Sequence, residues 1–548
     1  MDAAHPLDPS RRSFIAKTAA AAAGAALAGR GGAAEAADRQ GGRSRGPHQG
    51  LEEATIAELQ AQMESGQLSA RRLTSAYLQR IRQLDRRGPR LNSILTINPR
   101  ALEIAELRDA ERKAGKARGP LHGIPIVLKD NIDTLDRMHS TAGSLALVDS
   151  KPPRDATVAR KLRRAGAIIL GKTNLSEWAN FRSTQSASGW SGVAGQTRNP
   201  YVLDRNPCGS SSGSGTAVSA NLAAASLGTE TDGSIVCPSS ATGVVGIKPT
   251  VGLTSRAGVV PISHSQDTVG PMCRTVADAA VVLGALTGVD PRDPATRASR
   301  SHRHRDYRQF LDPQGLHGAR IGVARNLTGF SPETDEIFEA AVTAIRDAGA
   351  TVVDPANLDS AAELDASGAE FEVLLYEFKA DIRRYLATRS AGSPRTLADL
   401  IRFNEANAGH ELRWFGQEIF ELAQAKGPLT DPAYRQALRT GRRLARDEGL
   451  DKVLGEHNLD AIVAPTGSPA WPTDLVNGDH FLGGSSSVAA VAGYPLISVP
   501  AGFAFGLPVG ITFMGAAFAE PTLIRLASGF EAATAIRRAP DYEPTLPY

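Results

Sequence analysis

Short runs of apolar residues alternate with helix-like patterns along most of this chain. The first run, residues 124–128, is followed directly by Lys129, and similar runs recur as far as residue 513. Continuous apolar runs of this length are typical of strands that are covered on both faces. Between them, Phe338, Ala341 and Ile345 exemplify apolar residues at helical spacing. The alternation predicts an α/β fold with a central mixed β-sheet covered on both faces by helices. The predicted strands are residues 124–128, 167–170, 321–324, 351–353, 461–464, 496–499 and 509–513.

Composition is that of a folded protein. The chain has 548 residues, of which 42% are hydrophobic and 22% charged, so it can bury a large core and general disorder is excluded. Length alone suggests two or three domains. Residues 302–448 are more charged and mostly helical in pattern, so we expect a helical insertion or cap on the sheet there.

The basic residues are nearly balanced by acidic ones. There are 61 Lys and Arg against 58 Asp and Glu, which gives a net charge of +3. A protein that binds a phosphate backbone normally has a larger, clustered basic excess, so we expect no nucleic-acid partner. Only 11 of the 61 basic residues are lysines. A lysine inside an apolar or glycine-rich segment is therefore notable, because lysine, unlike arginine, can lose its proton and act as a base.

The chain has three cysteines, Cys208, Cys237 and Cys273, and no CxxC pair. The odd number and the spacing argue against a disulfide framework and against a zinc site. We therefore expect each cysteine to be a small buried hydrophobic side chain.

The N-terminus has the features of an export signal. Arg11 and Arg12 precede an alanine-rich stretch, residues 18–28, and small residues around 34–36 offer a cleavage site. The stretch is shorter than the ~20 apolar residues that span a bilayer. This order predicts a twin-arginine signal peptide over residues 1–36 and a linker over residues 37–50. We therefore expect the twin-arginine export machinery as a partner of the precursor, and a periplasmic or secreted mature protein. This route carries folded proteins, which fits the expected lack of disulfides.

Two loops rich in glycine and serine, residues 206–215 and 228–234, flank an alanine-rich segment, residues 216–227, that we expect to be a helix. Such turns let backbone N–H groups point into a cavity, as phosphate-binding loops and oxyanion holes require. No GxxxxGK[ST] or GxGxxG pattern is present here, which argues against phosphate binding.

Gly209-Ser210-Ser211-Ser212-Gly213 formally matches the GxSxG motif, with Ser211 as nucleophile. That motif needs a strand directly before it, whereas Pro200 and Pro207 interrupt the preceding segment. An esterase of the α/β-hydrolase type that uses Ser211 remains an alternative.

Lys129 ends a predicted buried strand. Burial there would lower the pKa of its amine, and a neutral amine can take a proton from a serine hydroxyl in Ser–Lys catalysis. The alternative is an ammonium group that reaches the surface or pairs with Asp130. Spacing alone does not decide between the two.

Lys129, the two loops and several further motifs follow one another along the chain in a recognisable order and spacing. Together they resemble the amidase signature family from about Leu51 to near the C-terminus, and within it the bacterial peptide amidases, which remove ammonia from the C-terminal amide of peptides. The resemblance implies one amidase-signature domain over residues 51–548. It also implies hydrolysis of peptide C-terminal amides or small amides through an acyl-enzyme, without metal or organic cofactor. The matching motifs are residues 129–134, 209–211, 229–235, 246–250, 498–502 and 506–510.

The resemblance assigns roles to the matching residues. It makes Ser234 the acylated nucleophile, Ser210, beside a cis peptide bond, the proton relay, and Lys129 the terminal base. It places Ser211 as a brace of the relay and Ala179 in the acyl pocket. The oxyanion hole it implies consists of the backbone N–H groups of Thr231, Asp232, Gly233 and Ser234.

The sequence departs from the commonest family pattern where Cys208, Ser212 and Asp232 replace glycines. We expect the Asp232 carboxylate to favour protonated Lys129 or to hold a cation of the substrate. Lys172 and Lys248 also lie in glycine-bounded segments, and we interpret both as structural or surface lysines.

Two further functions stay open besides the esterase. The glutaminase subunit of a tRNA-dependent amidotransferase shares the family's motifs, but it needs cytoplasmic partner subunits, and the export signal argues against it. An exported solute-binding protein is the non-enzymatic alternative. The sequence leaves the oligomeric state open.

Overall fold

The computed structural model describes residues 51–138 and 140–546. The predicted signal peptide and linker, residues 1–50, lie outside the described residues. Within the described part, no helix has both the length and the apolar character needed to cross a membrane.

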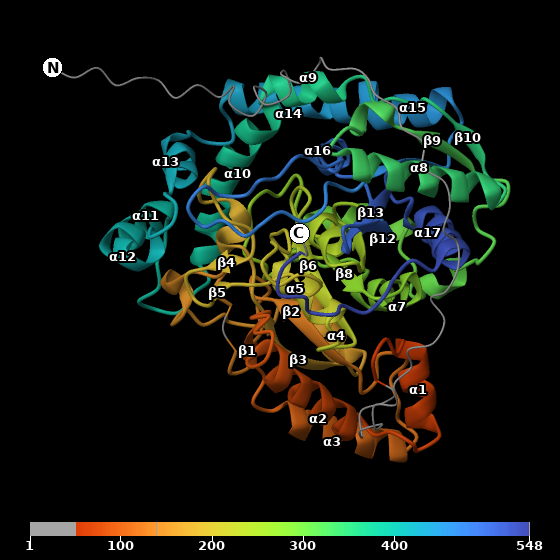
Figure 1. The fold of residues 1–548 in the computed structure, drawn as a ribbon. Helices are drawn as coiled ribbons and strands as arrows, with labels where there is room; N and C mark the ends of the chain where they lie inside the picture. The colour runs from red at the N-terminus through yellow and green to blue at the C-terminus, as the bar shows by residue number, and fades with distance from the viewer. Residues whose placement is uncertain (1–50, 139, 547–548) are drawn as a thin grey trace. The chain divides into compact units, whose positions relative to one another are not determined.

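A large mixed sheet organises the described residues (Figure 1). Its eleven strands within this part of the chain run in the order β1-β3-β2-β6-β8-β7-β12-β13-β11-β9-β10. Parallel pairs join β3, β2 and β6 on one side and β11, β9 and β10 on the other, with antiparallel pairs between them. The strands are β1 (Ile94–Ile97), β2 (Pro125–Lys129), β3 (Ile168–Thr173), β6 (Ala225–Glu230), β7 (Val245–Lys248), β8 (Thr268–Cys273), β9 (Arg320–Val323), β10 (Thr351–Val353), β11 (Ala461–Pro465), β12 (Leu496–Ala504) and β13 (Leu507–Met514); β4 (Trp190–Ser191) and β5 (Gly195–Gln196) form a separate pair.

Helices connect and cover these strands. Thr55 begins the first of them with a capping box, in which its side chain and that of Glu58 each accept a hydrogen bond from the other's backbone N–H. The helices are α1 (Ile56–Glu64), α2 (Ala70–Arg80), α3 (Ala101–Lys113), α4 (Thr157–Arg164), α5 (Ser212–Ser219), α6 (Val236–Ala241), α7 (Val276–Leu286), α8 (Pro332–Asp347), α9 (Ala361–Ser367), α10 (Ala369–Leu386), α11 (Leu397–Ala406), α12 (Ala408–Glu411), α13 (Glu418–Ala425), α14 (Pro432–Arg442), α15 (Asp451–Glu456), α16 (Ser487–Ala492) and α17 (Glu520–Thr534).

Strand β13 shows that both faces of the sheet are covered. Ile511 and Phe513 belong to the core that α7, α8 and α17 share. Met514 belongs to a second core with residues of α9, α15 and α16. Successive side chains of a strand point to opposite faces, so these two cores lie on opposite sides of the sheet. The predicted α/β class, with a mixed sheet covered on both faces, is confirmed, and all seven predicted strands are present in the sheet.

The predicted helix over residues 216–227 is wrong in its second half. Helix α5 begins earlier, at Ser212, and ends at Ser219, and Asn221 then adopts a left-handed φ of 55°. Residues from Ala225 onward form β6, which is buried along its whole length between β2 and β8. Tertiary pairing therefore overrides the helical preference of an alanine-rich segment.

Strand β6 lies parallel to β2, with Ile126 opposite Ala225 and Leu128 opposite Leu227. The carboxyl ends of two parallel strands meet at the same edge of a sheet, which is where α/β proteins place their sites. Lys129 at the end of β2 is thereby brought beside the glycine-rich turn that follows β6.

The segment 302–448 contributes to the sheet as well as to its cover. Strands β9 and β10 come from this segment, and the helices α9 to α14 follow between β10 and β11. Figure 1 shows α11, α12 and α13 grouped together, with α10 running from them toward α9. A buried contact anchors the end of α10: Arg389 pairs with Asp133, and Tyr385 donates a hydrogen bond to the same carboxylate at 3.0 Å.

Candidate active site

The amine of Lys129 is fully buried at the end of β2 and contacts both serine-glycine turns. Its Nζ donates a 2.7 Å hydrogen bond to Ser210 Oγ. It also lies 3.2 Å from the carbonyl oxygen and 3.0 Å from the hydroxyl of Thr229. Asn131 donates to that hydroxyl at 2.9 Å. The lysine neither reaches the surface nor pairs with Asp130, which instead accepts hydrogen bonds from Thr141.

Burial lowers the pKa of Lys129 to about 7, while the charges of Glu230 and Asp267 act in the opposite direction. All three hydrogen-bond partners of the amine are uncharged groups. A charged ammonium without a carboxylate in contact is disfavoured in a buried site. Near neutral pH the amine therefore exists in both protonation states, as a proton-transfer group requires.

Ser210 and Ser211 lie in the turn before α5, and the Gly209–Ser210 peptide bond is cis. The Ser211 hydroxyl donates to the carbonyl of Thr229 at 3.1 Å and accepts from the N–H of the same residue at 3.2 Å. The Ser211 N–H donates to the carbonyl of Ser234 at 3.1 Å. Ser211 thus joins its own turn to β6 and to the turn that carries Ser234.

Glu230, directly before the turn over residues 231–234, stabilises this turn by hydrogen bonds to the residues that follow it. Its buried carboxylate accepts hydrogen bonds from the N–H groups of Ile235 and Val236, at 2.7 and 3.0 Å, where α6 begins. Gly233 adopts a φ of +75°, a conformation that glycine enters freely. Within the described residues, the N–H groups of Asp232, Gly233 and Ser234 have no acceptor, so this turn presents free donors.

Two side chains of this turn are fixed by contacts that sequence reasoning missed. Asp232 accepts hydrogen bonds from Ser486 and Ser487 at 2.5 and 2.7 Å, at the start of α16. Thr231 donates to the buried carboxylate of Asp267 at 2.6 Å. No spacing pattern signals these partners, because they lie 36 or more positions away in the chain.

The expectation for two of the cysteines is wrong. Cys208 and Cys237 form a disulfide, with their Cα atoms 6.0 Å apart, whereas Cys273 is free and buried as expected. The bond joins the residue two positions before Ser210 to the residue three positions after Ser234. The 29-residue separation carries no signature of its own, and only the meeting of the two turns brings the sulfur atoms together.

Lys172 and Lys248 are structural and fully buried. Lys172 bonds to the carbonyl of Ile132 at 2.6 Å and lies 3.4 Å from Asp130. Lys248 bonds to the carbonyl of Tyr494 at 2.5 Å, and burial lowers its pKa to about 8. Ala179 is half-buried with a φ of 54°, and its N–H donates to Ser176, whose own N–H bonds to the carbonyl of Ser210.

Known proteins are similar to this chain in sequence and in fold. The Amidase family model matches residues 72–524. A probable amidase of Arabidopsis thaliana is 44% identical over 500 residues, which cover 90% of this chain and 92% of that protein. A solved peptide amidase from Stenotrophomonas maltophilia is 53% identical with a TM-score of 0.86, over 90% of this chain and all of that one. One subunit of the glutamyl-tRNA(Gln) amidotransferase of Halorhodospira halophila is 35% identical, over 88% of this chain and 98% of that one.

The chain belongs to the amidase family. It is an amide-hydrolysing enzyme with one amidase-signature domain, and its structure is close to that of peptide amidases. The α/β-hydrolase esterase and the solute-binding protein are thereby excluded. A physical reason also argues against Ser211 as the nucleophile of an esterase. Its hydroxyl is buried and forms hydrogen bonds with both the carbonyl and the N–H of Thr229.

Replacing Cys237 by serine should lower the free energy of unfolding by about 3 kcal/mol, because the cross-link removes chain entropy from the unfolded state. Urea denaturation followed by circular dichroism measures the change. Wild-type protein unfolded in the presence of a dithiol reductant should match the variant. Cys273→Ala, which leaves the cross-link intact, serves as control, and equal midpoints for oxidised and reduced wild type would show that the bond does not form.

Proposed function

We propose that this enzyme hydrolyses carboxamides through Ser234, Ser210 and Lys129, with C-terminal peptide amides or small amides as substrates. The observation that carries the proposal is the 2.7 Å contact between the buried amine of Lys129 and the Ser210 hydroxyl. A buried amine with a pKa of about 7 is able to accept a proton at neutral pH and return it later in the cycle.

In this mechanism Ser234 Oγ attacks the carbonyl carbon of the amide. Its proton passes to Ser210, and the proton of Ser210 passes to Lys129. The C–N bond then breaks as Lys129 returns a proton through Ser210 to the leaving nitrogen, which departs as ammonia. Water enters, loses a proton to Lys129 by the same route and attacks the acyl carbon. The acyl C–Oγ bond then breaks, the acid leaves, and the proton returns from Lys129 through Ser210 to Ser234 Oγ.

The negative charge that develops on the carbonyl oxygen needs donors already in place. We assign this role to the N–H groups of the 231–234 turn. The assignment is supported by the lack of an acceptor, within the described residues, for the N–H groups of Asp232, Gly233 and Ser234. One donor of this kind is typically worth ~3 kcal/mol in the transition state. Ser211 braces the relay through Thr229, and Ala179 is assigned to the acyl pocket because its turn bonds to that of Ser210.

The substrate assignment rests on similarity. The solved peptide amidase shares 53% of its residues with this chain, against 35% for the amidotransferase relative. A glutaminase role within an amidotransferase is the second candidate, and that 35% identity is what favours it.

We also propose that residues 1–36 direct the precursor to the twin-arginine export machinery and that the mature enzyme works in the periplasm or outside the cell. The expected lack of disulfides is wrong and no longer supports export. The Cys208–Cys237 disulfide supports the location instead, because disulfides persist in oxidising compartments and are rare in the cytosol.

The substrate assignment predicts that purified full-length protein releases ammonia from peptide amides with a kcat/KM at least tenfold above that for acetamide. A coupled ammonia assay over peptide amides, aryl amides, aliphatic amides and free glutamine measures the preference. Ser234→Ala is the blank. Hydrolysis of glutamine without hydrolysis of any peptide amide would instead assign the enzyme to the amidotransferase class.

Lys129→Met should reduce kcat/KM by about 10³-fold while the melting temperature changes little, because the variant fills the same space without a base. Steady-state kinetics and thermal unfolding are measured together. Lys161→Met is the matched control: Lys161 is a partly buried lysine on α4 whose amine bonds to the carbonyls of residues 286–288. It should keep activity within twofold. A Lys129→Met enzyme with near-native turnover would contradict the base assignment.

The lowered pKa of the Lys129 amine predicts how kcat/KM depends on pH. Lys129 acts only when neutral, so kcat/KM should rise about tenfold per pH unit below 7 and level off above it. Initial rates between pH 5 and 9, with an uncharged amide substrate, measure the midpoint. A rate that is independent of pH between 5.5 and 8 would show that the base has another identity.

A further inference from the structure

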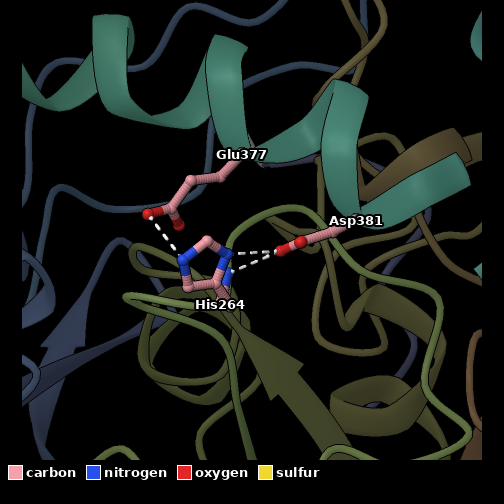
Figure 2. A group of neighbouring side chains, drawn as sticks. All are labelled: His264, Glu377 and Asp381. Carbon is pink, nitrogen blue, oxygen red and sulfur yellow. Dashed lines mark hydrogen bonds and ion pairs between the residues drawn. The ribbon is translucent and has the colours of Figure 1, made fainter. Parts of the chain in front are cut away.

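His264, Glu377 and Asp381 form a cluster outside the residues assigned to catalysis (Figure 2). His264 Nδ1 lies 2.9 Å from Asp381, and His264 Nε2 lies 3.2 Å from Glu377. The two carboxylates therefore face different nitrogens of one ring, whereas a metal ion binds one ring nitrogen at ~2.0–2.1 Å. The arrangement suits an imidazolium between two carboxylates. Burial by itself lowers the pKa of His264, but the hydrogen bond to Asp381 and the charges of both acids raise it overall.

This cluster attaches the loop over residues 262–267 to helix α10. The buried Glu377 carboxylate accepts hydrogen bonds from the hydroxyls of Ser263 and Ser265, each at 2.6 Å, and from the Ser265 N–H at 2.9 Å. Asp381, one turn further along α10, accepts from the His264 N–H at 3.0 Å. Three consecutive residues of the loop are thus bound to one helix.

The other end of the same loop holds Thr231. The Asp267 carboxylate accepts from the Thr231 hydroxyl at 2.6 Å with one oxygen, and from the N–H groups of Ile262 and Ser263 with the other. Gln266 lies between the two sides: its Nε2 is 2.7 Å from Glu370, at the start of α10, and 3.4 Å from the carbonyl of Thr231.

We propose that Gln266 and Asp267 are positioning residues of the oxyanion turn, and that α10 sets their place through Glu370, Glu377 and Asp381. The inference rests on the proposed function, since Thr231 begins the turn assigned to the oxyanion. The two contacts hold the side chain and the carbonyl of Thr231, and that carbonyl lies in the same peptide plane as the N–H of Asp232, one of the donors assigned to the oxyanion. Preorganised donors stabilise a transition state only when they are already aimed at the developing charge.

Thr231→Val tests the side-chain contact, because valine has the same shape and cannot donate to Asp267. We expect kcat to fall about tenfold with KM within twofold, whereas Thr231→Ser, which keeps the hydroxyl, should retain kcat within threefold. Gln266→Met removes the other contact and should likewise lower kcat about tenfold. His264→Phe, at a ring 39% exposed, should lower kcat by a smaller factor by loosening the loop from α10.

Glu372→Gln is the matched control, because Glu372 is also a carboxylate of α10 but pairs with Lys426 at 2.6 Å, away from the loop. It should leave kcat unchanged. Native kcat in both Thr231→Val and Gln266→Met would overturn the inference, as would an equal loss in Glu372→Gln.

Hydrogen exchange of the peptide 228–236 provides a readout that needs no turnover. Exchange there should be faster in Gln266→Met and His264→Phe than in wild type, and unchanged in Glu372→Gln. An inactive wild type would refute the proposed function, and the exchange result would still decide this inference. Unaltered exchange in Gln266→Met and His264→Phe would overturn it.

Discussion

The hydrogen bonds of the buried Lys129 amine are the interactions on which the rest of the site depends. Its direct partners are a serine hydroxyl and the hydroxyl and carbonyl of a threonine, so no carboxylate in contact compensates a positive charge. Lys172, one strand away and equally buried, differs because Asp130 lies 3.4 Å from its amine. Lys172 at the end of β3 is therefore an ion-pair partner, whereas Lys129 at the end of β2 has its pKa lowered by burial and has no carboxylate in contact. What separates the two roles is the chemistry of the nearest neighbours, since burial is common to both.

Sheet order brings the rest of the site to this amine. Because β2 and β6 are parallel neighbours, Lys129 and the turn after Glu230 lie at one edge of the sheet. Helix α5 leads from the Ser210 turn into β6, so both serine turns flank a single helix–strand unit. The Cys208–Cys237 bond closes this unit into a covalent ring that contains Ser210, Ser211 and Ser234. One backbone hydrogen bond between the turns adds to the cross-link.

Helices far from the sheet centre also bear on the site. Helix α10 is anchored near its end by the buried contact of Arg389 and Tyr385 with Asp133, which lies four residues after Lys129. The same helix binds the loop over residues 262–267 through three carboxylates. The segment 302–448 therefore contacts residues on both sides of the site: Asp133 beyond the end of β2, and the loop whose Gln266 and Asp267 contact Thr231.

Much of this could be predicted from the sequence. Apolar runs located seven strands, because a buried strand is recognisable from residues adjacent in the chain. The motifs around Lys129, Ser210 and Ser234 pointed to the family to which the chain belongs. The alanine-rich segment was misassigned beyond Ser219, since its strand exists only through pairing with β2 and β8.

Local sequence by itself determined the α/β class, the location of seven of the strands and the residue types able to move a proton. Only the tertiary structure decided that Cys208 bonds to Cys237, that Asp232 meets Ser486 and that Asp267 holds Thr231. These partners are 29 to 254 positions apart, and the order of strands in the sheet determines which distant turns meet. Periodicity is a property of neighbours in the chain, whereas a site is a property of neighbours in space.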